Sequence, residues 1–273
     1  MAVDDRSRVA THDPLVRVQG LSKHYAQGRW LSREKFVVQA LENVDLSIEA
    51  GCTLALVGES GSGKSTLARC LARLEEPTAG EISFDGKNLL ALSASELLPI
   101  RKQIQLVLQE PAGALNPRFS AVDVIAEPLV IYRLGSKATR RKRALELMEQ
   151  MGLPPEWGGK SPREFSGGQR QRLAIARALA LEPRFLILDE VLSGLDLSIQ
   201  AQIVNLLIEM QASHGLTYVL ISHDLSLMAS IADEIAVIYR GKIVERGAPA
   251  EVLTNSRHEH TRALVASMLG CAR

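Results

Sequence analysis

Apolar runs along the chain alternate with stretches whose apolar residues recur at helical spacing. Residues 44–48 alternate apolar and polar positions, which predicts a strand with one buried face. Residues 53–57, 185–188 and 218–222 are almost continuously apolar, which is typical of strands covered on both faces. Between residues 199 and 210 the apolar positions recur at the spacing of a helix. This order of strands and helices predicts an α/β fold around a parallel sheet.

The same pattern divides the chain into segments. Residues 1–14 are polar, so we expect a flexible lead-in before a core of residues 15–245. Within that core, residues from about 112 to 180 are rich in helix formers and predict a helical subdomain. Residues 246–273 are expected to form a C-terminal extension. A helix is expected from Ser65 to about residue 74, ahead of a proline that stops it.

Composition and charge narrow the classes of protein. Lys and Arg number 32 and Asp and Glu 31, and this balance argues against a nucleic-acid partner. The apolar runs span only a few residues, whereas a membrane helix needs about 20, so we expect no transmembrane segment. The first six residues lack the basic and apolar regions of a secretory signal. Cys52, Cys70 and Cys271 form no CxxC pair, which favours a reducing compartment over a disulfide framework.

The segment directly after the predicted strand 53–57 fits the pattern G-x-x-x-x-G-K-[ST] of a phosphate-binding loop. Its residues are Gly58, Glu59, Ser60, Gly61, Ser62, Gly63, Lys64, Ser65 and Thr66. The glycines let backbone N–H groups converge on phosphate oxygens, Lys64 would reach the β- and γ-phosphates, and Ser65 would ligate Mg²⁺. The alternative is a flexible Gly/Ser turn. The strand before and the helix after the segment favour nucleotide binding.

Two acids end the predicted strand 185–188. A phosphate loop requires a carboxylate that holds Mg²⁺ at the end of a neighbouring buried strand, and Asp189 fits that position. Glu190 would then orient or deprotonate the attacking water. Two acids that merely end a strand are the plainer alternative. Together with the phosphate loop, they predict a Mg²⁺-dependent nucleotide hydrolase.

Residues 165–172 read Phe-Ser-Gly-Gly-Gln-Arg-Gln-Arg. At the start of a helix, the serine hydroxyl and the backbone N–H groups of the two glycines could bind an anion. The alternative is a hinge before a basic helix. The segment resembles the signature of ATP-binding-cassette (ABC) ATPases, which usually has Leu where this chain has Phe165. The resemblance implies that Ser166, Gly167, Gly168 and Gln169, here called the signature segment, contact the ATP of a partner subunit. Two chains would then enclose two ATP molecules head to tail.

Other elements resemble the family in order. Gln109 resembles the glutamine that touches Mg²⁺ and senses the membrane partner, and Asp196 belongs to a segment that crosses the dimer interface. His223 resembles the histidine that contacts the γ-phosphate, and Tyr25 the aromatic residue that stacks on adenine. A structural histidine and a core aromatic residue are the respective alternatives. The resemblance implies a P-loop core with a parallel sheet, an antiparallel β subdomain and a helical insert, which is the ABC nucleotide-binding domain.

Three further stretches resemble the ATPases of peptide and nickel importers, namely residues 115–118, 196–202 and 258–264. The insertion at 28–38 and the segment 74–80 resemble the second ATPase subunit of such systems. The resemblance implies a bacterial importer on the cytoplasmic face of the inner membrane. Its partners would be integral membrane permease subunits, a second homologous ATPase and, indirectly, a solute-binding protein. A heterodimer of ATPases is favoured, although a homodimer is possible.

Some residues depart from the family pattern, and one other reading stays open. Val191 stands where the family usually has Pro, Glu110 replaces a common Asp, and Cys52 a common Glu. None of these changes removes a group expected to touch phosphate or metal. The alternative function is a soluble ABC-type ATPase that assists a metabolic enzyme complex, as in carbon–phosphorus bond cleavage. The basic run at 137–143 predicts a solvated helix face, with anionic lipid headgroups as its alternative partner.

Overall fold

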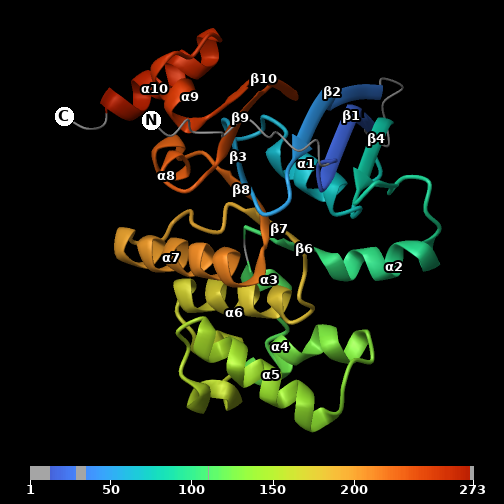
Figure 1. Ribbon diagram of the computed structural model, residues 1–273, viewed down its shortest axis with the longest axis vertical. Helices are drawn as coiled ribbons and strands as arrows, with labels where there is room; N and C mark the ends of the chain where they lie inside the picture. Colours follow the sequence, from blue (N-terminus) through green and yellow to red (C-terminus); the bar gives the residue numbers. More distant parts are fainter. Residues whose placement is uncertain (1–12, 29–34, 110, 271–273) are drawn as a thin grey trace, which may run out of the picture.

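The computed structural model describes residues 13–28, 35–109 and 111–270, which form two sheets surrounded by helices (Figure 1). The strands are β1 (Val16–Gly28), β2 (Lys35–Ile48), β3 (Thr53–Val57), β4 (Ala79–Phe84), β5 (Lys87–Asn88), β6 (Ile104–Val107), β7 (Phe185–Asp189), β8 (Thr217–Ser222), β9 (Glu234–Tyr239) and β10 (Lys242–Gly247). The α-helices are α1 (Lys64–Leu71), α2 (Ala94–Gln103), α3 (Pro111–Ala114), α4 (Ala121–Ile131), α5 (Lys137–Gln150), α6 (Gly167–Leu179), α7 (Leu197–His214), α8 (Leu225–Ala229), α9 (Pro249–Thr254) and α10 (Glu259–Gly270).

The larger sheet has six strands in the order β10-β9-β3-β8-β7-β6. Its strands run parallel except β10, which pairs antiparallel with β9. The prediction of an α/β fold around a parallel sheet is therefore confirmed. Because parallel strands end at one edge, the segments that follow β3, β6, β7 and β8 meet there. The register aligns Val57 with Ser222 and Asp189 with Ile221.

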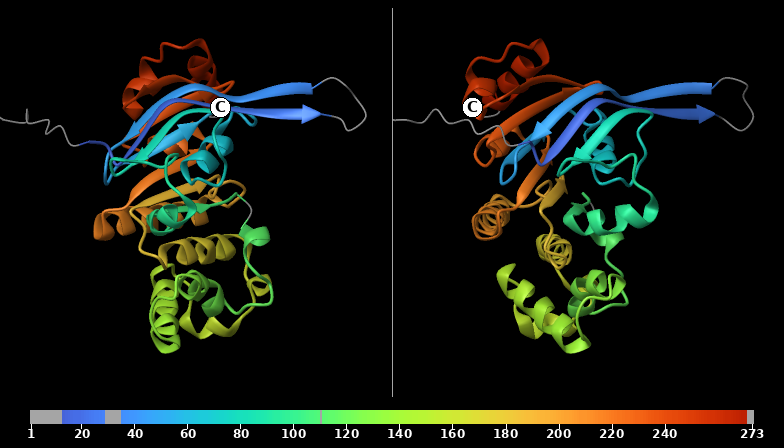
Figure 2. Two further views of the ribbon diagram at one scale, coloured as in Figure 1. Left: turned by 90° about the vertical axis from the view of Figure 1, so that its right-hand side faces the viewer. Right: turned by 45° about the vertical axis from the view of Figure 1, so that its right-hand side comes forward.

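The smaller sheet is antiparallel, with strand order β2-β1-β4-β5. Its two long strands continue beyond β4 as a ribbon that projects from the molecule (Figure 2). The predicted strand 44–48 is therefore only the end of β2, where Ile48 pairs with Val16. Farther along the ribbon, Tyr25 pairs with Val38. Most of the insertion predicted at 28–38 lies outside the described residues.

Between β6 and β7 the described residues form helices only. Helices α4, α5 and α6 pack on one another at the end of the molecule far from the antiparallel sheet (Figure 1). Helix α1 differs from the prediction because it ends at Leu71 rather than near residue 74. Arg73 ends it with a left-handed φ of 51°, four residues before Pro77. Among the described residues, no helix is both long and apolar enough to cross a bilayer.

The hydrophobic core has two parts, one on each face of the parallel sheet. Along β3, Ala55 and Val57 join the part shared with the helical layer. Leu54 and Leu56, which point the opposite way, join the part shared with α1 and the antiparallel sheet. Every residue of β3 is at most 2% exposed. The continuous apolar runs predicted burial on both faces, and the structure confirms it.

Candidate active site

Helix α1 begins at Lys64, and the loop before it is folded around that side chain. Lys64 is only 4% exposed, and its Nζ donates hydrogen bonds to the carbonyl oxygens of Gly58 (2.7 Å) and Glu59 (2.8 Å). Gly63 enters the helix with φ of 111°, and a Cβ there would lie 2.5 Å from the Ala40 carbonyl oxygen. Only glycine tolerates both the backbone conformation and this contact, so the motif glycine fixes how Lys64 enters the site.

The next residue links α1 to the end of β7. Ser65 Oγ donates to Asp189 Oδ1 at 3.2 Å, across 124 positions of sequence. Asp189 is 2% exposed, and this burial raises the pKa of its carboxyl, while the Ser65 hydroxyl bond opposes the shift. Burial also lowers the pKa of the Lys64 ammonium, against the opposing charges of Glu190, Asp189 and Glu59. The pair Ser65–Asp189 and the neighbouring ammonium thus form a buried polar centre.

Three residues expected from the sequence converge on the Glu190 carboxylate. Gln109 Nε2 donates to Glu190 Oε2 at 2.8 Å, and His223 Nδ1 lies 3.8 Å from the same oxygen. Lys64 Nζ lies 3.9 Å from Glu190 Oε1. Glu190 has a left-handed φ of 48°, and its N–H donates to the Ile221 carbonyl on β8. This strained backbone turns the carboxylate toward the sheet edge, where the other groups lie.

We call these six residues the strand-end cluster: Lys64, Ser65, Gln109, Asp189, Glu190 and His223. Its donors and acceptors fit a phosphate ester with a hard cation. The hydroxyl of Ser65 and carboxylate of Asp189 supply oxygen ligands of the kind that Mg²⁺ prefers. In the loop itself, the buried Ser62 Oγ has no hydrogen-bond partner in the structure. A phosphate oxygen would satisfy it, so the residues present fit ATP and Mg²⁺.

Tyr25 lies near the same loop. Its ring is half-buried, its hydroxyl donates to Glu75 Oε2, and burial raises the pKa of this hydroxyl. Lys23 Nζ lies 5.0 Å from the ring centroid. A hydrogen bond with Thr66 opposes the pKa shift, which brings Tyr25 next to the start of α1. The ring is therefore held beside the phosphate loop rather than inside either core.

The signature segment lies apart from the strand-end cluster. Ser166 is exposed and caps α6, where Gln169 N–H donates to Ser166 Oγ at 3.4 Å and Ser166 N–H donates to Gln169 Oε1 at 2.9 Å. A Cβ on Gly168 would lie 2.8 Å from Ile199, so α6 and α7 approach closely here. Asp196 is exposed at the start of α7. Within the part of the chain that the structure describes, no hydrogen bond or ion pair joins the segment to the cluster.

Sequence reasoning did not find every residue that shapes these sites. Glu75 and Lys23 fix the Tyr25 ring, but 50 positions separate Tyr25 from Glu75, and the segment 74–80 was singled out only for its family resemblance, not as a partner of the ring. Ser222 Oγ accepts from the Asp224 N–H at 2.9 Å and so shapes the turn that carries the histidine of the cluster. From the sequence, the position of Ser222 at the end of the predicted strand 218–222 could have indicated this role.

Comparison with known proteins gives close relatives. The ABC transporter family model matches residues 41–193. Two proteins named dipeptide transport ATP-binding protein DppF are 43% identical in Haemophilus influenzae and 45% identical in Escherichia coli. The alignments cover 96% and 93% of this chain, and 80% and 76% of the relatives. These similarities extend well beyond the motifs.

Solved structures agree with the sequence relatives. A post-hydrolysis dimer of the ATP-binding cassette MJ0796, bound to ADP and phosphate, is 32% identical with a TM-score of 0.77. It covers 86% of this chain and 98% of its own. The cbiO1 protein of Clostridium perfringens, part of an ABC transporter complex, is 28% identical with a TM-score of 0.78, covering 96% and 98%. This chain therefore belongs to the ABC transporter family and is one of its ATP-hydrolysing subunits.

Proposed function

We propose that this chain is the energy-coupling ATPase subunit of a bacterial peptide importer. The observation that carries the proposal is its 43–45% identity, over nearly the whole chain, to proteins named for dipeptide transport. Several Brucella relatives, 44% identical over 94% of this chain, carry the name putative peptide import ATP-binding protein. Nickel or another small solute is the alternative cargo within the same subfamily. We propose that the chain works at the cytoplasmic face of the inner membrane.

In this proposal the phosphate loop binds ATP. Lys64, already buried beside the loop carbonyls, contacts the β- and γ-phosphates in place of Gly58 and Glu59. The Ser65–Asp189 pair, with Gln109, holds Mg²⁺. When bound, that ion neutralises phosphate charge that develops in the reaction. The Tyr25 ring stacks on adenine, because it is fixed next to the loop by Glu75.

Hydrolysis requires a base next to the γ-phosphate. Glu190 is the carboxylate on which the cluster converges, and it accepts the proton of the attacking water. For this, Gln109 must release Glu190 Oε2, so that this oxygen can accept a hydrogen bond from the water. His223 is 62% exposed at the same oxygen, where it can contact the γ-phosphate. Most of the barrier reduction comes from positioning and from charge stabilisation.

The signature segment completes a second nucleotide site in trans. Its exposed serine and the first N–H groups of α6 form an anion cradle that no group of the strand-end cluster contacts. A homologous ATPase subunit therefore supplies the ATP that this segment contacts, and the resulting dimer drives two membrane permease subunits. We favour a heterodimer of ATPases. A solute-binding protein delivers the cargo to the permeases and contacts this chain only indirectly.

The test is purification of the tagged chain from gently solubilised native cells, followed by mass spectrometry of its companions. We expect two polytopic membrane proteins and a second cassette ATPase. Reconstituted in liposomes, that complex should hydrolyse ATP faster when the binding protein carries a dipeptide than when it is empty. If nickel rather than a dipeptide stimulates hydrolysis, the transported solute is nickel. If the chain is recovered with soluble enzymes and without membrane proteins, the alternative function is favoured, an ATPase that assists a metabolic enzyme complex.

A further inference from the structure

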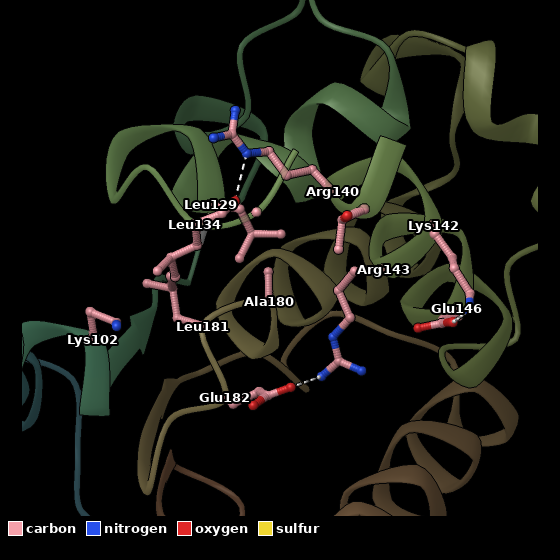
Figure 3. A pocket seen from close by; sticks show the side chains of 12 residues that line it. Lys102, Leu129, Leu134, Arg140, Lys142, Arg143, Glu146, Ala180, Leu181 and Glu182 are labelled. Atoms are coloured by element: carbon pink, nitrogen blue, oxygen red, sulfur yellow. Dashed lines mark hydrogen bonds and ion pairs between the residues drawn. The ribbon is translucent and has the colours of Figure 1, made fainter. Parts of the chain in front are cut away.

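A cavity of about 500 Å³ lies among the helices (Figure 3), and none of its lining residues belongs to the strand-end cluster. It is bounded by the end of α2, the α4–α5 connection, the first half of α5 and the link between α6 and β7. Lys102 precedes β6 and Glu182 precedes β7, so the cavity lies at the amino ends of these two parallel strands. The strand-end cluster lies at their carboxyl ends, roughly 15 Å away along the sheet. The cavity is therefore separate from the nucleotide site.

The lining of this cavity carries an excess of positive charge. Four cations line it, against the two carboxylates of Glu146 and Glu182. Lys142 pairs with Glu146 at 3.8 Å and Arg143 with Glu182 at 3.2 Å. The other two cations, Lys102 and Arg140, make no ion pair, since among the described residues neither has a carboxylate within 4.0 Å. This charge excess matches a ligand that carries two negative charges.

Arg143 is the most informative side chain of the lining. Its Nη2 pairs with Glu182, yet its Nε–H is buried without a hydrogen-bond partner in the structure. A buried donor without an acceptor is costly, and most such donors in folded proteins are satisfied. A ligand oxygen in the cavity would supply the missing acceptor. Arg140 also retains free donors, since among the described residues only its Nε makes a hydrogen bond, to the Leu134 carbonyl at 2.7 Å.

The basic residues stand at the electrostatically unfavourable end of their helix. Helix α5 begins at Lys137 after the cap Ser136, and its first turn contains no acidic residue. Helix N-termini carry partial positive charge, so nearby cations repel it unless an anion lies between them. The run at 137–143, predicted to be a solvated face, thus turns part of its charge into the cavity (Figure 3).

The remaining wall of the cavity is apolar. Leu129, Ala180 and Leu181 are at most 8% exposed, and Leu134 packs beside them. Ligand sites in proteins combine such an apolar wall with a few polar anchors and typically measure about 300–1,000 Å³. We infer that this cavity binds a phosphomonoester whose dianionic group contacts Arg143 and Lys102, and whose apolar part lies on the leucines. A soluble organic phosphate and a phosphatidic acid headgroup share this chemistry.

Calorimetric titration with phenyl phosphate tests the site, with ADP and Mg²⁺ saturating the nucleotide site. We expect saturable binding that Arg143→Gln and Lys102→Gln each weaken at least about tenfold, since charged hydrogen bonds are lost. The matched control is Arg141→Gln, which removes the same charge from the same helix outside the cavity lining and should change the affinity less than about twofold. Lys102 makes no ion pair among the described residues, and its Nζ lies 5.9 Å from the centroid of the Tyr132 ring. Replacing it therefore breaks no ion pair, and its variant guards against an effect of misfolding.

Sedimentation with vesicles identifies the source of the phosphate. Phosphatidylcholine vesicles with and without phosphatidic acid are compared for the wild type, Arg143→Gln and Arg141→Gln. Binding of phosphatidic acid vesicles that only Arg143→Gln abolishes identifies a lipid headgroup, whereas phenyl phosphate binding without vesicle binding identifies a soluble ligand. The proposal fails if neither probe binds, with no saturation by phenyl phosphate up to about 10 mM. It also fails if Arg141→Gln weakens binding as much as Arg143→Gln.

Discussion

In the proposed function, the strand-end cluster and the signature segment both contact phosphate, but they are built in opposite ways. In the cluster, Lys64 and Asp189 are almost fully buried and joined to residues more than 120 positions away. In the signature segment, Ser166 is exposed, and within the described part of the chain its side chain bonds only to Gln169, three residues along. The cluster is assembled by the sheet, whereas the segment is assembled by one turn of a helix.

This difference separates a site whose groups are all partnered within one chain from a helix start that still has unused donors. Every member of the cluster has a partner inside the chain, so one chain assembles the whole cluster. The cap of α6 satisfies one backbone donor, while the other N–H groups of its first turn have no acceptor within the helix. A preformed cradle without a counterpart in its own chain is suited to an anion that arrives on another subunit.

The largest expected effect comes from breaking the cluster at its centre. Glu190→Gln preserves the shape and the acceptor for Gln109 but removes the base, so turnover should fall about 10²–10⁴-fold. ATP binding should persist, and the variant should accumulate as a closed dimer. Steady-state hydrolysis and gel filtration with ATP measure both effects. Near-normal hydrolysis would remove Glu190 from this role, and Glu209→Gln, an exposed acid on α7, controls for charge.

The next effect distinguishes the two regions directly. Ser166→Ala should lower the maximal rate of the assembled complex at least about tenfold, because one hydrogen bond to a charged oxygen is lost. It should leave the affinity of the isolated chain for ATP unchanged within about twofold, since the segment does not contact the cluster.

Ser120→Ala is the matched control for that experiment. Ser120 caps α4 with the same reciprocal bonds to Asp123, so both variants lose a helix cap, which costs about 1 kcal/mol. Only the Ser166 variant should lose turnover. Equal losses in the two variants would mean that Ser166 acts only as a cap, and the contrast between the regions would fail.

A smaller effect concerns the edge of the cluster. Tyr25→Ala should raise the KM for ATP and GTP alike, by about tenfold, because stacking accepts any base. Tyr25→Phe removes the hydrogen bond to Glu75 but keeps the ring, so its KM should stay within about threefold of the wild type. Initial-rate measurements with both nucleotides check this. If Tyr25→Ala leaves the KM unchanged, the ring has only a structural role.

The sequence was most informative where local chemistry and burial coincide. The strand β3, the phosphate loop and α1 are contiguous, and apolar runs mark β7 and β8, so the position of Asp189 could be read directly. Parallel strands share one edge, and this brought Glu190 and His223 toward the loop. These predictions needed only strand ends, which a continuous apolar run locates well.

Contacts between distant segments could not be predicted in this way. The bond between Tyr25 and Glu75 depends on how the segment between α1 and β4 lies along β1. The projecting half of β2 was missed because Val37 and Val38 are both exposed, so no alternation marks it. Most of the basic run at 137–143 is exposed, as predicted, but the ion pair of Arg143 with Glu182 before β7 joins two segments that no local pattern links.

The smallest predicted effect tests whether burial sets the chemistry of the cluster. Burial raises the pKa of Asp189, so between the unfolded-state value of about 3.9 and the higher folded value the native state binds more protons. The free energy of unfolding must therefore fall as the pH rises through this window. Asp189→Asn removes this proton linkage, so its stability relative to the wild type should increase as the pH rises through this window.

Urea unfolding of the nucleotide-free protein at several pH values from about 4 to 7 measures that slope. Asp196→Asn supplies the comparison from the other region, because its exposed carboxylate is hydrated in both the folded and unfolded states. It should keep the wild-type slope. If Asp189→Asn also keeps it, water reaches Asp189 as freely as it reaches Asp196, and the buried polar centre would not distinguish the cluster from the signature segment.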